Sequence, residues 1–288
     1  MKQLLILSGK GGTGKTTTAS AFIRFSEARA FADCDVDAPN LHLAAGEFPD
    51  APEMSLYYGT DMSMIDKEKC VSCGLCAETC KFGAIRMENG KYRVNPFVCE
   101  GCGVCMHVCP HGAVVMRPDT SGDVMTFRAE DRTFVTAMLK MGRGNSGKLV
   151  SAVKGKLAAE APDVPFAVID GSPGTGCPVI ASITGVDMVL IVAEPSLSGL
   201  SDMQRILKVA DILETPAVVC INKWDTSPEH AQKIEAYCAE NNIPVLGRIP
   251  FDSAVPKAIN DGISIADISC PARDALKSIY DKVMEMMA

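Results

Sequence analysis

Apolar residues along the chain follow two kinds of pattern. Apolar runs, which are typical of strands, occupy residues 3–8, 166–170, 186–194, 216–222 and 243–250, and a further predicted strand at residues 29–35 ends in acidic residues. The intervening segments 15–28, 201–214 and 227–242 instead place apolar residues three or four positions apart, which predicts helices. Strands that are apolar throughout are buried on both faces. Their alternation with helices therefore predicts an α/β fold with a mostly parallel sheet flanked by helices.

A cysteine-rich stretch of about 55 residues interrupts this pattern. We expect a discontinuous α/β domain formed by residues 1–62 and 119–288, with a second, smaller domain inserted at residues 63–118. The segment that precedes the cysteines, residues 47–66, has only weak periodicity and predicts a connection.

Composition excludes several classes of function. The 288 residues carry a net charge of −7, which argues against nonspecific binding of nucleic acid. The first apolar run, Leu4 to Leu7, is too short for a signal peptide, and no stretch approaches the roughly 20 apolar residues that cross a bilayer. We therefore expect a cytoplasmic protein without stable membrane insertion.

The segment "GKGGTGKT" at residues 9–16 matches the phosphate-binding loop G-x-x-x-x-G-K-[ST] between a predicted strand and a predicted helix. Backbone N–H groups of such a loop close around phosphate oxygens, Lys15 reaches the outer phosphates, and the Thr16 hydroxyl ligates Mg²⁺. The sequence thus predicts a nucleoside triphosphate site that includes Gly11, Gly12, Thr13, Gly14, Lys15, Thr16 and Thr17.

The additional lysine of "KGGTGKTT", Lys10, resembles the deviant phosphate loop of the MinD, ParA and Mrp ATPases, the superfamily of the nitrogenase iron protein. The resemblance implies an ATP-dependent homodimer, or a heterodimer with a related subunit, in which Lys10 touches the partner's phosphates. The segment "DCDVDAPNLHL" at 33–43 resembles the family's switch I, and there Asp35 would orient the attacking water. We interpret Asp37 as a loop acid.

Three further segments extend the resemblance. In "IDGSPGTG" at 169–176, Asp170 takes the position of the acid at Mg²⁺, and Gly174 lies in the same switch II segment. "NKWD" at 222–225 allows two interpretations, because N-K-x-D binds guanine in GTPases. The resembled family instead contacts adenine through the Asn, which favours ATP and makes Asn222, Lys223 and Pro250 candidate base-binding residues. Phosphoryl transfer is mostly positioning and charge neutralisation, so Lys10, Lys15, Asp35 and Asp170 are the candidate catalytic residues.

The cysteine-rich stretch contains one motif twice. "CVSCGLCAETC" begins at Cys70 and "CEGCGVCMHVC" at Cys99, and both have the spacing C-x₂-C-x₂-C-x₃-C. In bacterial ferredoxins this run binds two [4Fe–4S] clusters, and the fourth cysteine of each run ligates the other cluster. The insert is therefore predicted to be a small α+β ferredoxin-like domain with two ligand sets, Cys70, Cys73, Cys76 and Cys109 for the first and Cys99, Cys102, Cys105 and Cys80 for the second.

Zinc is the alternative, but zinc ribbons use two cysteines per half rather than four. The remaining cysteines, Cys34, Cys177, Cys220, Cys238 and Cys270, are mostly expected to be small buried hydrophobes. Cys177 follows switch II, where the nitrogenase iron protein has its bridging-cluster cysteine, but we favour a small residue packed under the loop.

These features favour an ATPase that couples hydrolysis to electron transfer with a redox or metal-cluster protein as partner. Two alternatives remain open. One is an Mrp-like carrier of iron–sulfur or metal clusters, and the other is a MinD-like spatial regulator with a redox-sensing insert. The terminal segment 272–288 has one apolar face but no basic face, which predicts a packed helix rather than a membrane anchor.

Overall fold

A nine-stranded sheet forms the body of the protein in the computed structural model, which describes residues 1–43, 46, 48 and 50–288. The strand order is β13-β12-β11-β1-β10-β2-β9-β8-β3, with the first seven parallel and β8 and β3 antiparallel. The strands are β1 (Lys2–Leu7), β2 (Ala30–Asp33), β3 (Glu53–Tyr58), β8 (Thr120–Arg128), β9 (Thr133–Leu139), β10 (Phe166–Asp170), β11 (Met188–Ala193), β12 (Ala217–Asn222) and β13 (Val245–Ile249).

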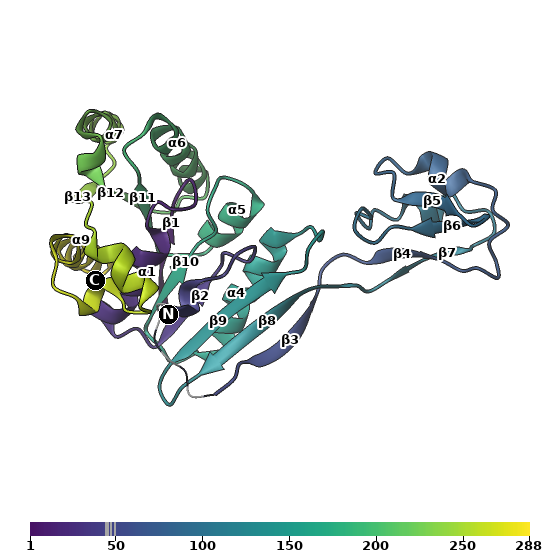
Figure 1. The fold of residues 1–288 in the computed structure, drawn as a ribbon, viewed down its shortest axis with the longest axis horizontal. Helices are drawn as coiled ribbons and strands as arrows, with labels where there is room; N and C mark the ends of the chain where they lie inside the picture. The colour runs from purple at the N-terminus through teal and green to yellow at the C-terminus, as the bar shows by residue number, and fades with distance from the viewer. Residues whose placement is uncertain (44–45, 47, 49) are drawn as a thin grey trace.

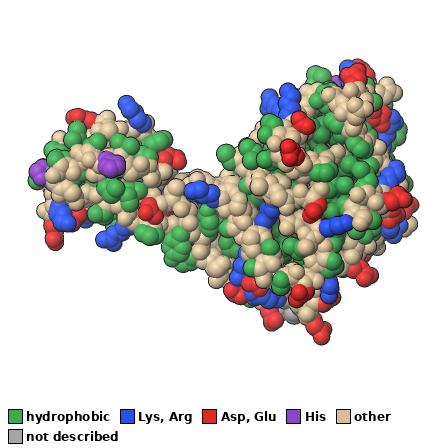
Figure 2. All heavy atoms as spheres, turned by 180° about the vertical axis from the view of Figure 1, so that it is seen from behind, with side chains coloured by type: hydrophobic (Ala, Val, Ile, Leu, Met, Phe, Trp, Pro, Cys, Tyr) green, Lys and Arg blue, Asp and Glu red, His purple; other side chains and the backbone are tan. Residues whose placement is uncertain are grey.

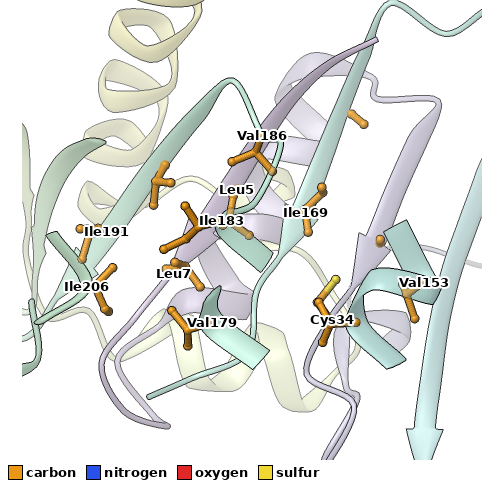
Figure 3. Close-up of a cluster of buried hydrophobic side chains, with 14 of the residues drawn as sticks. Leu5, Leu7, Cys34, Val153, Ile169, Val179, Ile183, Val186, Ile191 and Ile206 are labelled. Carbon is orange, nitrogen blue, oxygen red and sulfur yellow. The ribbon is translucent and has the colours of Figure 1, made fainter. Parts of the chain in front are cut away.

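Helices cover both faces of this sheet (Figure 1). Strand β1 shows why its sequence is apolar throughout, because Leu5 and Leu7 enter one core cluster while Leu4 and Ile6 enter the other. The first cluster (Figure 3) lies under α4 (Ser146–Glu160), α5 (Cys177–Ile183), α6 (Leu197–Ile212) and α7 (Pro228–Glu240). The second lies under α1 (Lys15–Ser26) and α9 (Pro271–Met287), beside α8 (Ala254–Asn260) and the short helices η1 (Leu41–Leu43) and η3 (Ile265–Asp267). The predicted mostly parallel α/β fold is confirmed.

Residues 47–66 were wrongly predicted as a connection. The described part of this segment contains β3 and also β4 (Met62–Ile65). Strand β3 lies at the edge of the sheet and is exposed on most of its residues. The alternation of Glu53 and Ser55 with Met54 and Leu56 was the available signal of a strand. An aromatic cluster joins this antiparallel edge to the parallel strands, since Phe134 of β9 stacks on Phe31 of β2 at 5.2 Å and on Phe127 of β8 at 5.3 Å.

A small lobe stands apart from the body on a narrow neck (Figures 1 and 2). It consists of β4, α2 (Leu75–Thr79), β5 (Ile85–Glu88), β6 (Lys91–Val94), α3 (Val104–His107) and β7 (Val114–Arg117). Strand β4 pairs with β7 and β5 with β6, both antiparallel. Each cysteine run thus lies in one strand–helix–strand unit, and the two units have the same order of elements.

The neck, residues 59–61 and 118–119, joins the main sheet to the separate two-stranded sheet of β4 and β7 in the lobe. The chain leaves the body along β3 and enters the lobe along β4, then returns along β7 into β8. Because β3 pairs with β8 and β4 with β7, two antiparallel ladders lie end to end between body and lobe. The lobe is therefore held through backbone hydrogen bonds at both ends of the neck.

The terminal helix α9 buries Ala272, Leu276, Ile279, Val283 and Met287 against the second core cluster, as the apolar face of 272–288 predicts. Within the residues that the structure describes, no helix has the length and apolar character that crossing a bilayer requires.

The aromatic cluster generates a stability prediction. Replacing Phe134, which is fully buried, by alanine removes its stacking on Phe31 and Phe127 and leaves a cavity. We expect the free energy of unfolding, measured by urea denaturation, to fall by about 3–5 kcal/mol. Leu197→Ala is the control, because Leu197 is 71% exposed, and it should change this free energy by less than about 0.5 kcal/mol. Equal effects of the two substitutions would contradict the packing described for the cluster.

Candidate functional site

The loop that follows β1 opens directly into α1 and lines a cleft of about 400 Å³. Gly14 precedes the helix with φ at +96°, and a Cβ there would lie 2.3 Å from Nδ2 of Asn222. Glycine is therefore required at this position by both the backbone conformation and the close side chain. The amide of Asn222 donates to the carbonyl of Thr13 at 2.6 Å, which ties the end of β12 to the loop.

A fully buried carboxylate, Asp170, lies at the end of β10 behind this loop. Its Oδ1 is 2.6 Å from Nζ of Lys15, and its Oδ2 accepts a hydrogen bond of 2.7 Å from the Thr16 hydroxyl. The amide oxygen of Asn40 lies 3.2 Å from the same hydroxyl. Hydroxyl, carboxylate and amide oxygens are the ligands that Mg²⁺ prefers, so these three side chains fit a magnesium ion.

A second buried carboxylate, Asp33, organises the segment after β2. It accepts backbone N–H bonds of 2.9 Å from Asp35, Asn40 and Leu41. Burial, reinforced by the negative charge of Asp170, raises the pKa of Asp33 to about 7. Burial also raises the pKa of Asp35, which lines the cleft.

Most of the predicted nucleotide-site residues come together at the cleft. Its lining includes Lys10, Gly11, Gly12, Gly14, Lys15, Thr16, Thr17, Asp35, Asn222, Lys223 and Pro250. The other predicted residues lie behind this lining. Thr13 is buried, Asp170 contacts the cleft through Lys15 and Thr16, and the backbone N–H of Gly174 bonds to the carbonyl of Ser8 at 3.1 Å.

Lys10 and Lys223, which both line the cleft, pair with an acid that the sequence analysis missed. Glu194, at the end of β11, lies 2.5 Å from Nζ of Lys10 and 3.9 Å from Nζ of Lys223. Lys223 also donates to the carbonyl of Gly12 at 2.9 Å. Glu194 belongs to the segment "AEPSLSGLSD", and its position at the end of an apolar run was the available signal. Asn40 and the organising role of Asp33 were missed in the same way.

Asp225 of the N-K-x-D segment points elsewhere. Its Oδ1 accepts a 2.7 Å hydrogen bond from the backbone N–H of Phe251, and Asp225 is not among the residues that line the cleft. Its carboxylate thus joins the short helix η2 (Trp224–Thr226) to the segment after β13.

The eight cysteines of the lobe line two hollows. One hollow is bounded by Cys70, Cys73, Cys76 and Cys109, and the other by Cys80, Cys99, Cys102 and Cys105. Each hollow thus takes three cysteines from one run and the last cysteine from the other run. The fourth cysteines have the same backbone donors, since the N–H of Ala84 bonds to Sγ of Cys80 at 3.4 Å and that of Ala113 to Sγ of Cys109 at 3.3 Å.

These sulfurs do not converge on one point. Within the described residues, no group of three or more His, Cys, Asp and Glu side chains could hold a metal ion. A single zinc ion would bring its four sulfurs to within about 4 Å of one another, given Zn–S bonds of about 2.3 Å. A four-iron cluster takes one thiolate at each iron and so spreads its ligands further apart. Each hollow nevertheless offers four cysteine thiols, the number of protein ligands that a four-iron cluster takes.

The cysteines outside the lobe are buried, as predicted, with one exception. Cys34, Cys220, Cys238 and Cys270 are buried, but Cys177 is exposed at the start of α5. The prediction that Cys177 packs under the loop is wrong, because Gly176 and Cys177 are both exposed where α5 begins.

Comparison with known proteins agrees with this architecture. A family described as CobQ/CobB/MinD/ParA nucleotide binding domain matches residues 4–265. The uncharacterized protein MJ0578 of Methanocaldococcus jannaschii is 32% identical over 99% of this chain and 97% of its own. An iron–sulfur cluster carrier protein of Methanococcus maripaludis is 26% identical over 43% of this chain and 47% of its own.

Among solved structures, the septum site-determining protein MinD of Pyrococcus horikoshii, complexed with Mg-ADP, is similar with a TM-score of 0.57. It is 17% identical, and the match covers 100% of this chain and 97% of that one, so the likeness is one of fold. The family match spans most of the chain and includes the phosphate loop and the buried carboxylates. The chain therefore belongs to the CobQ/CobB/MinD/ParA nucleotide-binding family.

Proposed function

We propose that this protein is a Mg²⁺-dependent ATPase whose nucleotide cycle is coupled to electron transfer through two [4Fe–4S] clusters in the lobe. The observation that carries the ATPase part is the contact of Asp170 with both Lys15 and Thr16 at the phosphate loop. In this proposal Lys15 neutralises the phosphates, Thr16 and Asp170 hold Mg²⁺, and Asp35 orients the attacking water. Lys10 would act on the nucleotide of a partner subunit in an ATP-dependent dimer, either with a second copy or with a related chain.

Adenine is the better fit for the base. The carboxylate that would have to bind guanine, that of Asp225, is already occupied by the N–H of Phe251. The cleft beyond Asn222 and Pro250 is bounded by apolar side chains, Ile249, Val255, Ile259, Ile265 and Leu276. Such a lining suits a purine ring. Asp252 also lines this part of the cleft, but its Oδ1 already accepts a hydrogen bond of 2.9 Å from the backbone N–H of Ala254.

The redox part rests on the two cysteine-lined hollows. We assign Cys70, Cys73, Cys76 and Cys109 to one cluster and Cys99, Cys102, Cys105 and Cys80 to the other. When bound, the clusters supply one-electron transfer. The lobe carries them away from the body, where a redox protein or metal-cluster protein can approach (Figure 2).

A chain of contacts supports coupling between the two ends of the molecule. The N–H of Leu139 bonds to the carbonyl of Val36, beside Asp35, at 2.9 Å. Four residues further along, the guanidinium of Arg143 donates to the carbonyl of Pro96 at 2.7 Å and lies 2.8 Å from Oδ2 of Asp119. Pro96 lies in the lobe, shortly before Cys99, and Asp119 lies between β7 and β8. Arg143 therefore contacts both the lobe and the segment through which the chain returns to the body.

A second candidate function is delivery of iron–sulfur clusters. The resemblance of part of this chain to proteins named iron–sulfur cluster carrier favours it, and the exposed thiol of Cys177 is a possible labile ligand. A carrier should pass its clusters to an apo-ferredoxin when MgATP is added. The redox protein should keep its iron in the same assay.

The ATPase proposal predicts the effect of Lys15→Gln. This substitution removes the cation from the phosphate site but keeps a hydrogen-bond donor near Asp170. We expect the steady-state rate of ATP hydrolysis to fall by at least about 100-fold, as when one transition-state donor is removed elsewhere. Chelation of Mg²⁺ by EDTA should abolish hydrolysis by the unaltered protein. Lys208→Gln, at an exposed position of α6, is the matched control and should hydrolyse ATP normally. Full activity of Lys15→Gln would refute the assigned role.

The coupling proposal predicts the effect of Arg143→Ala. In the unaltered holoprotein, MgATP should change hydrogen exchange of the backbone amides at residues 95–101, because Arg143 transmits movement of the loop at Asp35 to the lobe. The substitution should remove this change. Affinity for MgATP should stay within about twofold, since Arg143 lies outside the cleft.

Arg128→Ala is the matched control for this experiment. Arg128 also pairs with acids, Glu53 at 2.8 Å and Glu160 at 2.6 Å, but these partners lie in the body. The response of residues 95–101 to MgATP should survive in this variant. If both variants or neither lost the response, Arg143 would not be the coupling residue.

A further inference from the structure

The two halves of the lobe repeat the same elements and cysteines 29 residues apart. A residue that differs between equivalent positions can therefore distinguish the two proposed cluster sites. A shift of 29 residues brings β4 onto β6, the start of α2 onto that of α3, and β5 onto β7. The four cysteines of each run match in burial as well. Cys73 and Cys102 are exposed, Cys76 and Cys105 are buried, and the others are intermediate. The backbone donors to Cys80 and Cys109 are equivalent too.

One hydroxyl that contacts a cysteine sulfur breaks this symmetry. Ser63 of β4 is buried, and its Oγ lies 3.0 Å from Sγ of Cys105, inside the second hollow. The equivalent residue of the other half is Tyr92, which lines the first hollow and whose hydroxyl lies beside Gly74. In the part of the chain that the structure describes, Tyr92 has no hydrogen bond to a cysteine sulfur, so the sulfur of Cys76 lacks the side-chain donor that Cys105 has.

The direction of this hydrogen bond follows from the chemistry of the ligand. A cysteine bound to iron is a thiolate without a proton, so Ser63 must be the donor. The only other acceptor near its hydroxyl among the described contacts is Sδ of Met116 at 3.3 Å, which is uncharged and weaker. Donation to a cluster sulfur stabilises the reduced, more negative cluster and so raises its reduction potential.

Charges around the second hollow do not cancel this effect. Lys81 and Glu100 both line it, and their opposite charges offset each other. His111 lines the first hollow, and the equivalent residue 29 positions earlier, Phe82, lines the second. The exposure classes of the cysteines and the bonds from Ala84 and Ala113 are matched, so the Ser63 hydroxyl is the side-chain donor that reaches a ligand sulfur in one hollow and has no counterpart in the other.

We propose that Ser63 makes the cluster of Cys80, Cys99, Cys102 and Cys105 the higher-potential one of the pair, so that an electron entering the lobe rests there. This inference rests on the proposed function, because it takes both clusters as present. The second hollow is also the one next to the body. A Cβ on Gly101 would lie 2.2 Å from the carbonyl of Asp61 in the neck, and Gly144 lies close to Glu100. Ser63 would thus hold the electron on the side that Arg143 contacts.

The test is an EPR-monitored redox titration of the holoprotein with dithionite, with iron content measured on the same samples. The unaltered protein should show two separate reduction potentials. Ser63→Ala should shift the higher one toward more negative values and leave the lower one in place. Ser63→Thr, which keeps the hydroxyl, should keep the original potential. Tyr92→Phe is the control at the equivalent position and should leave the higher potential unchanged.

The outcomes separate this inference from the function on which it rests. Iron-loaded protein with two equal potentials, or a Ser63→Ala protein with unshifted potentials, would overturn the role of Ser63 and leave the redox function standing. Protein without iron after anaerobic purification would overturn the proposed function itself. If Ser63→Ala does not fold, the unaltered protein and Ser63→Thr still test the inference. Two clusters of equal potential within each of these proteins would contradict it.

Discussion

The contact between the buried carboxylate of Asp170 and the ammonium of Lys15 is the interaction on which the nucleotide end depends. A carboxylate without any exposure is costly unless it is paired and hydrogen-bonded. Lys15 and Thr16 meet both needs, and both lie in the first turn of α1. The position of this helix, and therefore of the phosphate loop before it, is thus fixed against the central strand β10. Asp33 on the neighbouring strand extends the same arrangement to the segment that carries Asp35.

The lobe depends on a different constraint. Its buried core consists of only a few side chains, Cys76, Ile85, Cys105 and Val114, and two of these are proposed ligands. So small a core supplies little hydrophobic stabilisation, and metal binding commonly contributes the rest in domains of this kind. The two ladders of the neck then transmit the geometry of the main sheet to the lobe. We therefore propose that nucleotide binding orders the body and cluster binding orders the lobe. The two parts are connected by the strands of the neck and by Arg143.

Sequence reasoning succeeded where chemistry or burial leaves a strong pattern. Strand β10 was predicted with the bounds that the structure has, because both of its faces are buried and its residues are apolar up to the final Asp170. The predicted position of the glycine-rich loop between a strand and a helix was confirmed, since β1 ends at Leu7 and α1 begins at Lys15. Strand β3 was missed because its alternation of polar and apolar residues, Glu53 to Leu56, extends over only a few positions. Glu194 and Asn40 were missed because their roles come from tertiary contacts with Lys10 and Thr16, which no local pattern encodes.

One measurement tests the central claim that the nucleotide site and the lobe communicate. Protein purified without oxygen should be reduced, and its EPR spectrum recorded with and without MgATP, with iron content determined on the same sample. We expect about eight iron atoms per chain, four for each cluster, and an EPR spectrum that changes when MgATP binds. A fully loaded protein whose spectrum is the same with and without MgATP would contradict it.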